Sequence, residues 1–140
     1  MEMSDNRIRV LCAEDNRDLA AMLQAFIDSE DDMCCVGLAE SGDGLAEMVA
    51  SSRADIVVMD LSMPGRSPIQ TLRDIGERSA TSKVLIHSGY DDQTSIDQAV
   101  AAGAWGFVSK HGDPQRLPDA IRRVSAGEMV IATGAAPFAR

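Results

Sequence analysis

The chain has 140 residues, of which 13 are basic and 22 acidic, and its formal net charge is −9 at pH 7. This length suits one ordinary domain with a real core rather than two domains. An acidic surface repels phosphate backbones and anionic membranes, so the composition argues against direct binding of nucleic acid. No apolar run approaches the roughly 20 residues of a spanning helix, and the start MEMSDNR does not resemble a signal peptide. We therefore expect a cytoplasmic domain.

The cysteines and histidines argue against a disulfide framework and a zinc site. Three cysteines are an odd number, and the adjacent Cys34 and Cys35 would point to opposite faces of a strand. We expect both, and Cys12, to be reduced and mostly part of the core. The only histidines, His87 and His111, show no zinc-binding spacing.

The chain opens with the pattern of a strand followed by a helix. The apolar run IRVLCA (8–13) is typical of a buried strand, and Asn16 then favours the start of a helix. Apolar residues recur along this helix at the spacing of a stripe that faces the core: Leu19, Met22, Leu23, Phe26 and Ile27.

The same pair of patterns then repeats three times. The strand-like runs are MCCVGLA (33–39), DIVVMD (55–60) and KVLIHS (83–88). The helices after them are marked by Leu45, Met48 and Val49, by Ile69, Leu72 and Ile75, and by Ile96, Ala99 and Val100, with an end near Gly103.

The last strand, WGFVSK (105–110), precedes a fifth helix. Asp113 is its predicted N-cap, Pro114 its first residue and Gly127 its end. Pro118 removes a backbone donor one turn in, which predicts a kinked or 3₁₀-like start. The residues expected to face inward are Leu117, Ala120, Ile121 and Val124.

Strict alternation of apolar strands and helices predicts a doubly wound α/β domain, with five parallel strands and helices on both faces. We expect this domain to span residues 7–128. Residues 129–140, with the segment IATGAAPFAR (131–140), are expected to form a poorly ordered tail or the start of a linker. In such sheets ligands bind beyond the carboxyl ends of the strands.

Charged and hydroxyl side chains follow or end four of these strands: Glu14, Asp15, Asp60, Ser88 and Lys110. Crowded carboxylates repel one another, and Mg²⁺, which prefers oxygen ligands, offsets that repulsion. An aspartate neutralised in this way can attack phosphorus, while a lysine and a hydroxyl hold the phosphoryl oxygens. The apolar run VVMDLSMPG (57–65) thus ends in a candidate phosphate acceptor, Asp60.

These motifs resemble the receiver (CheY-like) domains of bacterial two-component response regulators. The resemblance covers residues 8–127 and rests on ED (14–15), DLSMPG (60–65), HSG (87–89) and FVSK (107–110). The end of the domain, AGAWGFVSKHGDPQRLPDAIRRVSAGE, is similar to the NarL/FixJ-type subfamily. The resemblance implies a flavodoxin-like strand order 2-1-3-4-5 and, in relatives, a helix-turn-helix DNA-binding domain after the receiver.

The resemblance assigns a role to each residue of the site. Asp60 would accept the phosphoryl group from a histidine kinase, and Lys110 would pair with it. Asp15 would bind Mg²⁺ directly, Glu14 through water, and Ser62 through its backbone carbonyl. Pro64 and Gly65 fit the turn after the acceptor strand.

The resemblance also implies a switch and its partners. Ser88 would move toward the phosphate and Phe107 would rotate with it, changing a surface that binds a downstream protein or a linked DNA-binding domain. Homodimerisation on phosphorylation is a further expectation, with charged groups on the switch face: Arg116, Arg122, Arg123, Asp91, Asp92 and Asp97. The simpler interpretation, which we favour, is that those arginines form a solvated helix face.

The chain departs from the family pattern after the acceptor. Relatives continue with an Asp-Gly-like turn, whereas RSPIQT brings Pro68, so the start of the third helix is not fixed. Ser62 and Tyr90 occupy positions that vary in the family. These positions flank the path of the water that would attack the phosphorylated aspartate. The lifetime of the phosphorylated state therefore does not follow from the sequence.

The same residues also admit simpler and rival interpretations. Strand-end acids can merely cap helices, Lys110 can be a surface charge, and His87 can pack at its strand end. A phosphatase of the haloacid dehalogenase type needs a second aspartate two residues after the acceptor, where Ser62 stands. No phosphate-binding G-x-x-x-x-G-K-[ST] loop is present. The remaining alternatives are a receiver that is not phosphorylated and the receiver fragment of a LuxR/NarL-type transcription factor.

Overall fold

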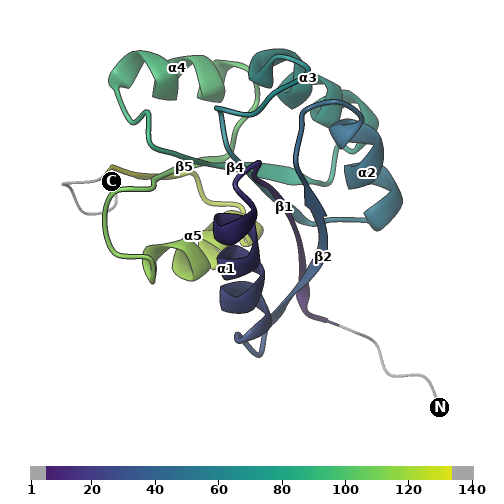
Figure 1. Ribbon diagram of the computed structural model, residues 1–140, viewed down its shortest axis with the longest axis vertical. Coiled ribbons are helices and arrows are strands. Elements are labelled where there is room, and N and C mark those ends of the chain that lie inside the picture. The colour runs from purple at the N-terminus through teal and green to yellow at the C-terminus, as the bar shows by residue number, and fades with distance from the viewer. Residues whose placement is uncertain (1–5, 134–140) are drawn as a thin grey trace.

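The structure is a computed structural model that describes residues 6–133 (Figure 1). Its elements alternate along the chain: β1 (Ile8–Ala13), α1 (Arg17–Asp28), β2 (Met33–Ala39), α2 (Leu45–Ser52), β3 (Ile56–Met59), α3 (Pro68–Arg78), β4 (Lys83–Ser88), α4 (Gln93–Ala101), β5 (Gly106–Ser109), α5 (Arg116–Ser125) and β6 (Val130–Ala132). The longest of these helices has 12 residues. No helix within residues 6–133 is therefore long and apolar enough to cross a membrane.

The strands form one parallel sheet in the order β2-β1-β3-β4-β5-β6. The order 2-1-3-4-5 is confirmed, but the prediction of five strands is wrong, because Val130–Ala132 adds a sixth strand beside β5. Three residues are too few to show the alternation that identifies a strand. The prediction of a poorly ordered tail is thus wrong for Ile131 and Ala132, and residues 134–140 lie outside the described residues.

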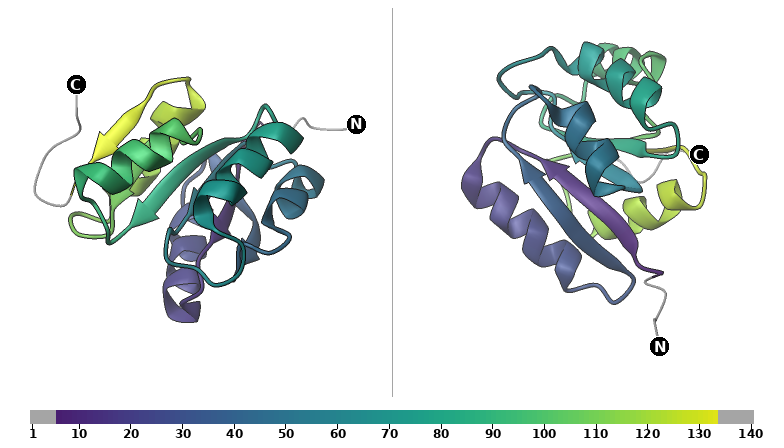
Figure 2. Two further views of the ribbon diagram at one scale, coloured as in Figure 1. Left: turned by 90° about the horizontal axis from the view of Figure 1, so that it is seen from above. Right: turned by 90° about the vertical axis from the view of Figure 1, so that its right-hand side faces the viewer.

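The sheet is covered on both faces. Figures 1 and 2 show α2, α3 and α4 on one side and α1 and α5 on the other. A hydrophobic core lies on each face of the sheet. Every residue of β3 is buried, since its side chains alternate between these two cores. This burial explains why the strand reads as a continuous apolar run. The doubly wound α/β class is confirmed.

Helix starts follow from local side chains. Asn16 accepts a hydrogen bond from the Leu19 amide at 3.1 Å, as expected for the N-cap of α1. Ser67 does the same for Gln70 at 3.2 Å, and Pro68 occupies the first position of α3, where its missing N–H costs nothing. Pro68 thus begins the third helix, the point that the sequence left open.

The fifth helix begins later than predicted. It starts at Arg116 with Gln115 as its N-cap residue, rather than at Pro114 with Asp113 as its N-cap. The amide of Arg116 donates to the Asp113 carbonyl at 3.0 Å, a bond of the i→i−3 type. Pro118 lies in the first turn, where backbone amides lack helical partners in any case. The tight turn matches the expected 3₁₀-like start.

Candidate functional site

The carboxyl ends of β1 and β3 bring three carboxylates together. Glu14 and Asp15 follow β1, Asp60 follows β3, and one oxygen from each lies within 4.8 Å of the others. Glu14 and Asp60 are buried and Asp15 is exposed. The sequence therefore identified a real cluster, and β1 and β3 meet because they are hydrogen-bonded neighbours in the sheet.

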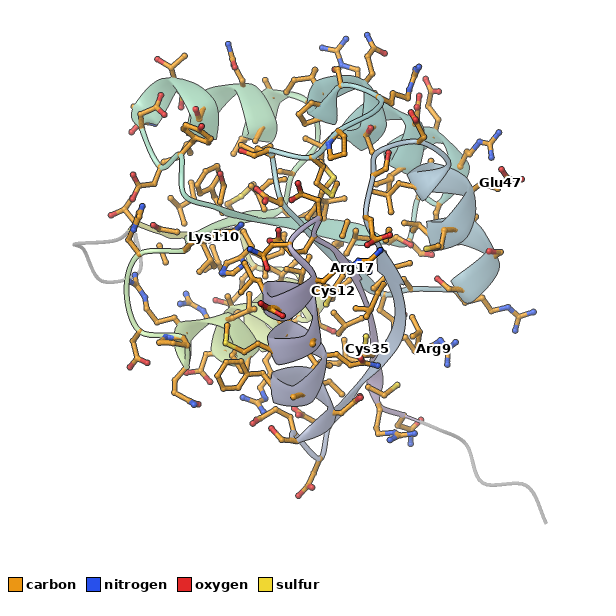
Figure 3. The ribbon with its side chains drawn as sticks, in the orientation of Figure 1. Arg9, Cys12, Arg17, Cys35, Glu47 and Lys110 are labelled. Atoms are coloured by element: carbon orange, nitrogen blue, oxygen red, sulfur yellow. The ribbon has the colours of Figure 1, made fainter. Side chains whose placement is uncertain are left out.

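Lys110 connects two of these acids. Its Nζ lies 2.8 Å from Asp60 Oδ2 and 2.8 Å from Glu14 Oε1. It comes from the end of β5 and is labelled in Figure 3 at the edge of the sheet. Burial lowers the Lys110 pKa, but hydrogen bonds and charge from Asp60 and Glu14 outweigh this effect and raise it. Lys110 is thus held as a cation within the acidic cluster.

Glu14 is the acid that most needs compensation. Its side chain is 2 % exposed, and this burial, with the charge of Asp60, raises its pKa against the opposing effects of Lys110 and the Asn16 amide. The Asn16 amide donates to Oε2 at 3.1 Å. Oε1 lies 2.8 Å from Lys110 Nζ. One ammonium, shared with Asp60, thus compensates this buried carboxylate.

The loop after Asp60 holds its carboxylate in place. The Ser62 amide donates to Asp60 Oδ1 at 3.0 Å. Gly65 has a φ of 89°, and a side chain there would meet Ser41 Oγ at 2.4 Å. Only glycine suits both constraints. The amide of Gly42 also donates to the Pro64 carbonyl at 3.0 Å, which ties this loop to the neighbouring one.

Ser88 and Phe107 are both fully buried at the predicted switch position. Ser88 Oγ accepts a hydrogen bond from the Tyr90 amide at 3.0 Å, while its carbonyl accepts from the Lys110 amide at 2.8 Å. Phe107 packs in the core between the sheet and α4. Tyr90 itself is 63 % exposed.

His87 faces the opposite side of β4 from Ser88, beside a cavity of about 220 Å³. Leu19, Phe26 and Leu117 line this cavity together with Lys110, which also contacts the acidic cluster. Burial, and then the charge of Lys110, lower the His87 pKa to about 4 against the effect of Asp60. No pattern in the sequence indicates this cavity, since α1 and α5 form its walls only after folding.

The arginines expected at a dimer face have partners within the chain. Arg122 contacts Asp32 at 2.7 Å and Asp119 at 3.1 Å, and it also pairs with Glu30. Other charged groups on the switch face are engaged as well. Arg123 contacts Glu128, Arg116 donates to the Thr133 carbonyl, Asp92 caps α4, and Asp97 accepts from Gln93.

The donor set suits a hard divalent cation. Glu14, Asp15 and Asp60 offer carboxylate oxygens within 4.8 Å of one another, and the two buried acids share the single Lys110 ammonium. Mg²⁺ needs one or two carboxylates and keeps several waters. The exposed side chain of Asp15 leaves such waters access. The residues therefore fit Mg²⁺.

The sequence profile of the response regulator receiver domain matches residues 10–122. The chain belongs to this family. It is 33 % identical over 124 residues to the transcriptional regulatory protein YvfU of Bacillus subtilis, covering 89 % of this chain and 62 % of YvfU. It is 28 % identical over 128 residues to the nitrate/nitrite response regulator NarL of Escherichia coli, covering 91 % of this chain and 59 % of NarL.

A solved structure supports the same assignment. The receiver resembles a LuxR-family two-component response regulator from Aurantimonas with a TM-score of 0.84 and 26 % identity, over 92 % of this chain and 91 % of that one. The present chain spans about three fifths of the length of the curated relatives named above. It is thus a response regulator receiver domain similar to those of NarL- and LuxR-family regulators.

Proposed function

We propose that this receiver is a phosphorylation switch in which Asp60 accepts a phosphoryl group from a histidine kinase. The observation that supports this most directly is the contact of Asp60 with Lys110 at 2.8 Å, beside Glu14 and Asp15. A lone strand-end aspartate would need no such neighbours. The same contact argues against the simpler view of Lys110 as an ordinary surface charge.

The chemistry divides among the residues of the cluster. An Asp60 oxygen attacks phosphorus, so that a P–O bond forms as the bond between phosphorus and the donor's imidazole nitrogen breaks. Lys110 Nζ then pairs with a phosphoryl oxygen. Asp15, Glu14 and the Ser62 carbonyl are the groups that would hold Mg²⁺ beside Asp60. The bound cation supplies charge neutralisation for the carboxylates and the transferring group.

Ser88 would couple phosphorylation of Asp60 to a change of conformation. Its Oγ already accepts from the Tyr90 amide, so its hydroxyl proton is available to a phosphoryl oxygen. A phosphoryl group shifts a two-state equilibrium only if it contacts the two states differently. Phe107 neighbours this position in the core, and its apolar ring leaves no polar group unsatisfied when buried.

The output surface is the face formed by α4, β5 and α5. We expect this face to bind a second copy of the chain on phosphorylation, or a downstream protein or linked DNA-binding domain. Relatives such as NarL support the last of these, since their chains are longer and are named as regulators. Because Arg122 and Arg123 have partners within the chain, self-association would depend on other groups of this face.

A turnover enzyme is less well supported. The phosphatase alternative needs a general acid two residues after Asp60, and Ser62 occupies that place with its amide turned to Asp60. We therefore assign phosphate acceptance and later loss of that phosphate, but no external substrate.

Intact-mass measurement with a small phosphodonor and Mg²⁺ tests this proposal. We expect one phosphoryl group on the wild type and on Asp32→Asn, whose acid lies far from the site on the loop before β2, and none on Asp60→Asn. Equal incorporation in all three proteins would sink the assignment of the acceptor.

A further inference from the structure

The cavity beside His87 lies between α1 and α5, which cover the same face of the sheet (Figure 1). Its wall is mostly apolar and includes Leu23 and Phe26 of α1, Val108 of β5 and Leu117 of α5. Of these, Leu23, Val108 and Leu117 are at most 4 % exposed. Core residues of three elements thus form the wall, as is usual for a ligand site that is present before the ligand binds.

Most polar groups of the wall are already engaged elsewhere. Lys110 Nζ is paired with the two buried acids of the acidic cluster. Ser109 Oγ accepts a hydrogen bond from the amide two residues on, at 3.0 Å, and Asp113 Oδ1 accepts one in the same way, at 3.0 Å. A water molecule in a buried site needs two to four polar partners. The wall therefore favours an apolar ligand over water.

His87 differs from these residues because it keeps an unused polar group. Its Nδ1 is buried and has no hydrogen-bond partner within residues 6–133. Burial and the charge of Lys110 lower the pKa of His87 to about 4, so the imidazole is neutral at pH 7. A ligand that carries one N–H or O–H group can supply a hydrogen bond to a neutral imidazole.

The charges around the cavity favour a neutral ligand. Lys110 lines the wall and would repel a cation, whereas Asp113, in the loop before α5, would repel an anion. An anion could bind Lys110 only by drawing it away from Asp60 and Glu14, which would leave two buried acids without their partner.

We propose that this cavity is a binding site for a small, neutral, bicyclic aromatic molecule that carries one N–H or O–H group. Its volume of about 220 Å³ sets the size of the ligand. An apolar cavity of about 150 Å³ holds benzene, so this one has room for a fused second ring. The site shares Lys110 with the acidic cluster but does not depend on phosphorylation of Asp60.

Titration of the wild type with indole, followed by the chemical shifts of backbone amides, tests the site. We expect saturable binding, with the largest shifts in residues 19–26 of α1 and 108–117 around the start of α5. The absence of saturation up to the solubility limit of indole would overturn the proposal. So would saturable shifts that lie mainly outside these two segments and His87.

A variant that fills the cavity tests the same site by loss of binding. Leu19 lines the cavity and is only partly buried, so the larger ring of Leu19→Trp can enter it. The affinity for indole should fall at least about tenfold, because the ring and the ligand need the same space. The matched control is Met48→Trp, which enlarges a partly exposed apolar residue of α2, on the opposite face of the sheet.

Met48→Trp should bind indole as the wild type does. Equal affinities of Leu19→Trp and the wild type would overturn the proposal. The chemical shifts of the wild type decide the question even if Leu19→Trp does not fold.

The chemistry of the ligand is tested with two analogues of indole. Benzofuran has the same shape but no N–H group, so the wild type should bind it about fivefold more weakly than indole. His87→Phe should bind the two compounds equally. Indole-2-carboxylate, which is anionic at pH 7, should bind the wild type at least about tenfold more weakly than indole. A wild type that binds benzofuran as well as indole, or the carboxylate more tightly, would refute the proposed ligand class.

Discussion

Two clusters in this receiver each surround one cation with carboxylates. The inner cluster consists of Lys110, Glu14 and Asp60, and the outer cluster of Arg122, Glu30, Asp32 and Asp119. In the inner cluster the acids are 2 % and 5 % exposed, whereas the outer acids are 28 % to 64 % exposed. The arrangement of charges is similar, but only the inner cluster is removed from water.

Burial changes what such a cluster can do. In the inner cluster, desolvation raises the Glu14 pKa despite the nearby lysine, so the acids remain poorly compensated and suited to a further cation. In the outer cluster, the hydrogen bond from Arg122 and then its charge lower the Asp32 pKa, and the small desolvation of this exposed acid does not outweigh them. Similar charges thus form a buried acidic cluster in one place and an exposed ion-pair network between α5 and the loop before β2 in the other.

The largest expected difference between the clusters is in metal binding. Asp15→Ala should abolish Mg²⁺ binding and phosphorylation, because a direct ligand is lost where the metal offsets carboxylate repulsion. Titration calorimetry with Mg²⁺ measures the first effect and intact mass the second. The control is Asp18→Ala, which removes an exposed acid from the first turn of α1. Unchanged metal affinity in Asp15→Ala would refute the ligand role.

The next largest difference is expected in the free energy of unfolding when Lys110 or Arg122 is replaced. Lys110→Met leaves two buried acids without their partner and should lower the free energy of unfolding by about 2 kcal/mol at neutral pH. Arg122→Met should cost under about 1 kcal/mol, since its partners are solvated. Urea unfolding without Mg²⁺ measures both. A larger loss for Arg122→Met would reverse the comparison.

A smaller effect, on the phosphorylation-dependent change of conformation, is expected at Ser88, whose carbonyl accepts a hydrogen bond from the Lys110 amide. Ser88→Ala should keep phosphorylation but lose the coupled change in the α4-β5-α5 face, because the hydroxyl can contact the phosphoryl group in only one of two states. Sedimentation and amide exchange over residues 90–125, with and without beryllofluoride, measure that change.

Ser109→Ala is the matched control for this experiment. Ser109 pairs in register with Ser88, is also buried, and likewise accepts a hydrogen bond from the amide two residues on, at 3.0 Å. It should respond to beryllofluoride as the wild type does. If Ser88→Ala also responds normally, Ser88 is only a phosphate ligand or a turn residue. If the wild type shows no response, the switch route is wrong.

The smallest effect concerns pH and the outer cluster. Since Arg122 lowers the folded-state pKa of Asp32, the contribution of Asp32 is present above its unfolded pKa and is lost as pH falls through the folded value. The wild type should exceed Asp32→Asn in stability by under about 1 kcal/mol at neutral pH. Urea unfolding should show this gap closing below roughly pH 4. A gap that widens on acidification would contradict the sign.

Local signals in the sequence predicted most of the framework. Asn16 before an apolar stripe marks the start of α1 because a side-chain cap and a 3.6-residue period act within one short segment. The strand ends likewise identified Glu14, Asp60 and Lys110, since parallel strands place their carboxyl ends on one edge. The start of α5 was placed two residues too early, because a tight turn and a helix begin with the same residue types.

The sequence by itself determined the alternation of strands and helices and the edge of the sheet at which the acids meet, because both depend on period and order. Only the tertiary structure decided that Val130–Ala132 joins the sheet, since three residues carry no period and need β5 as a partner. It also decided that Lys110 bridges Glu14 and Asp60, and that Arg122 pairs with Glu30 and Asp32. These contacts join residues far apart in the chain, and their energies depend on burial, which no local pattern records.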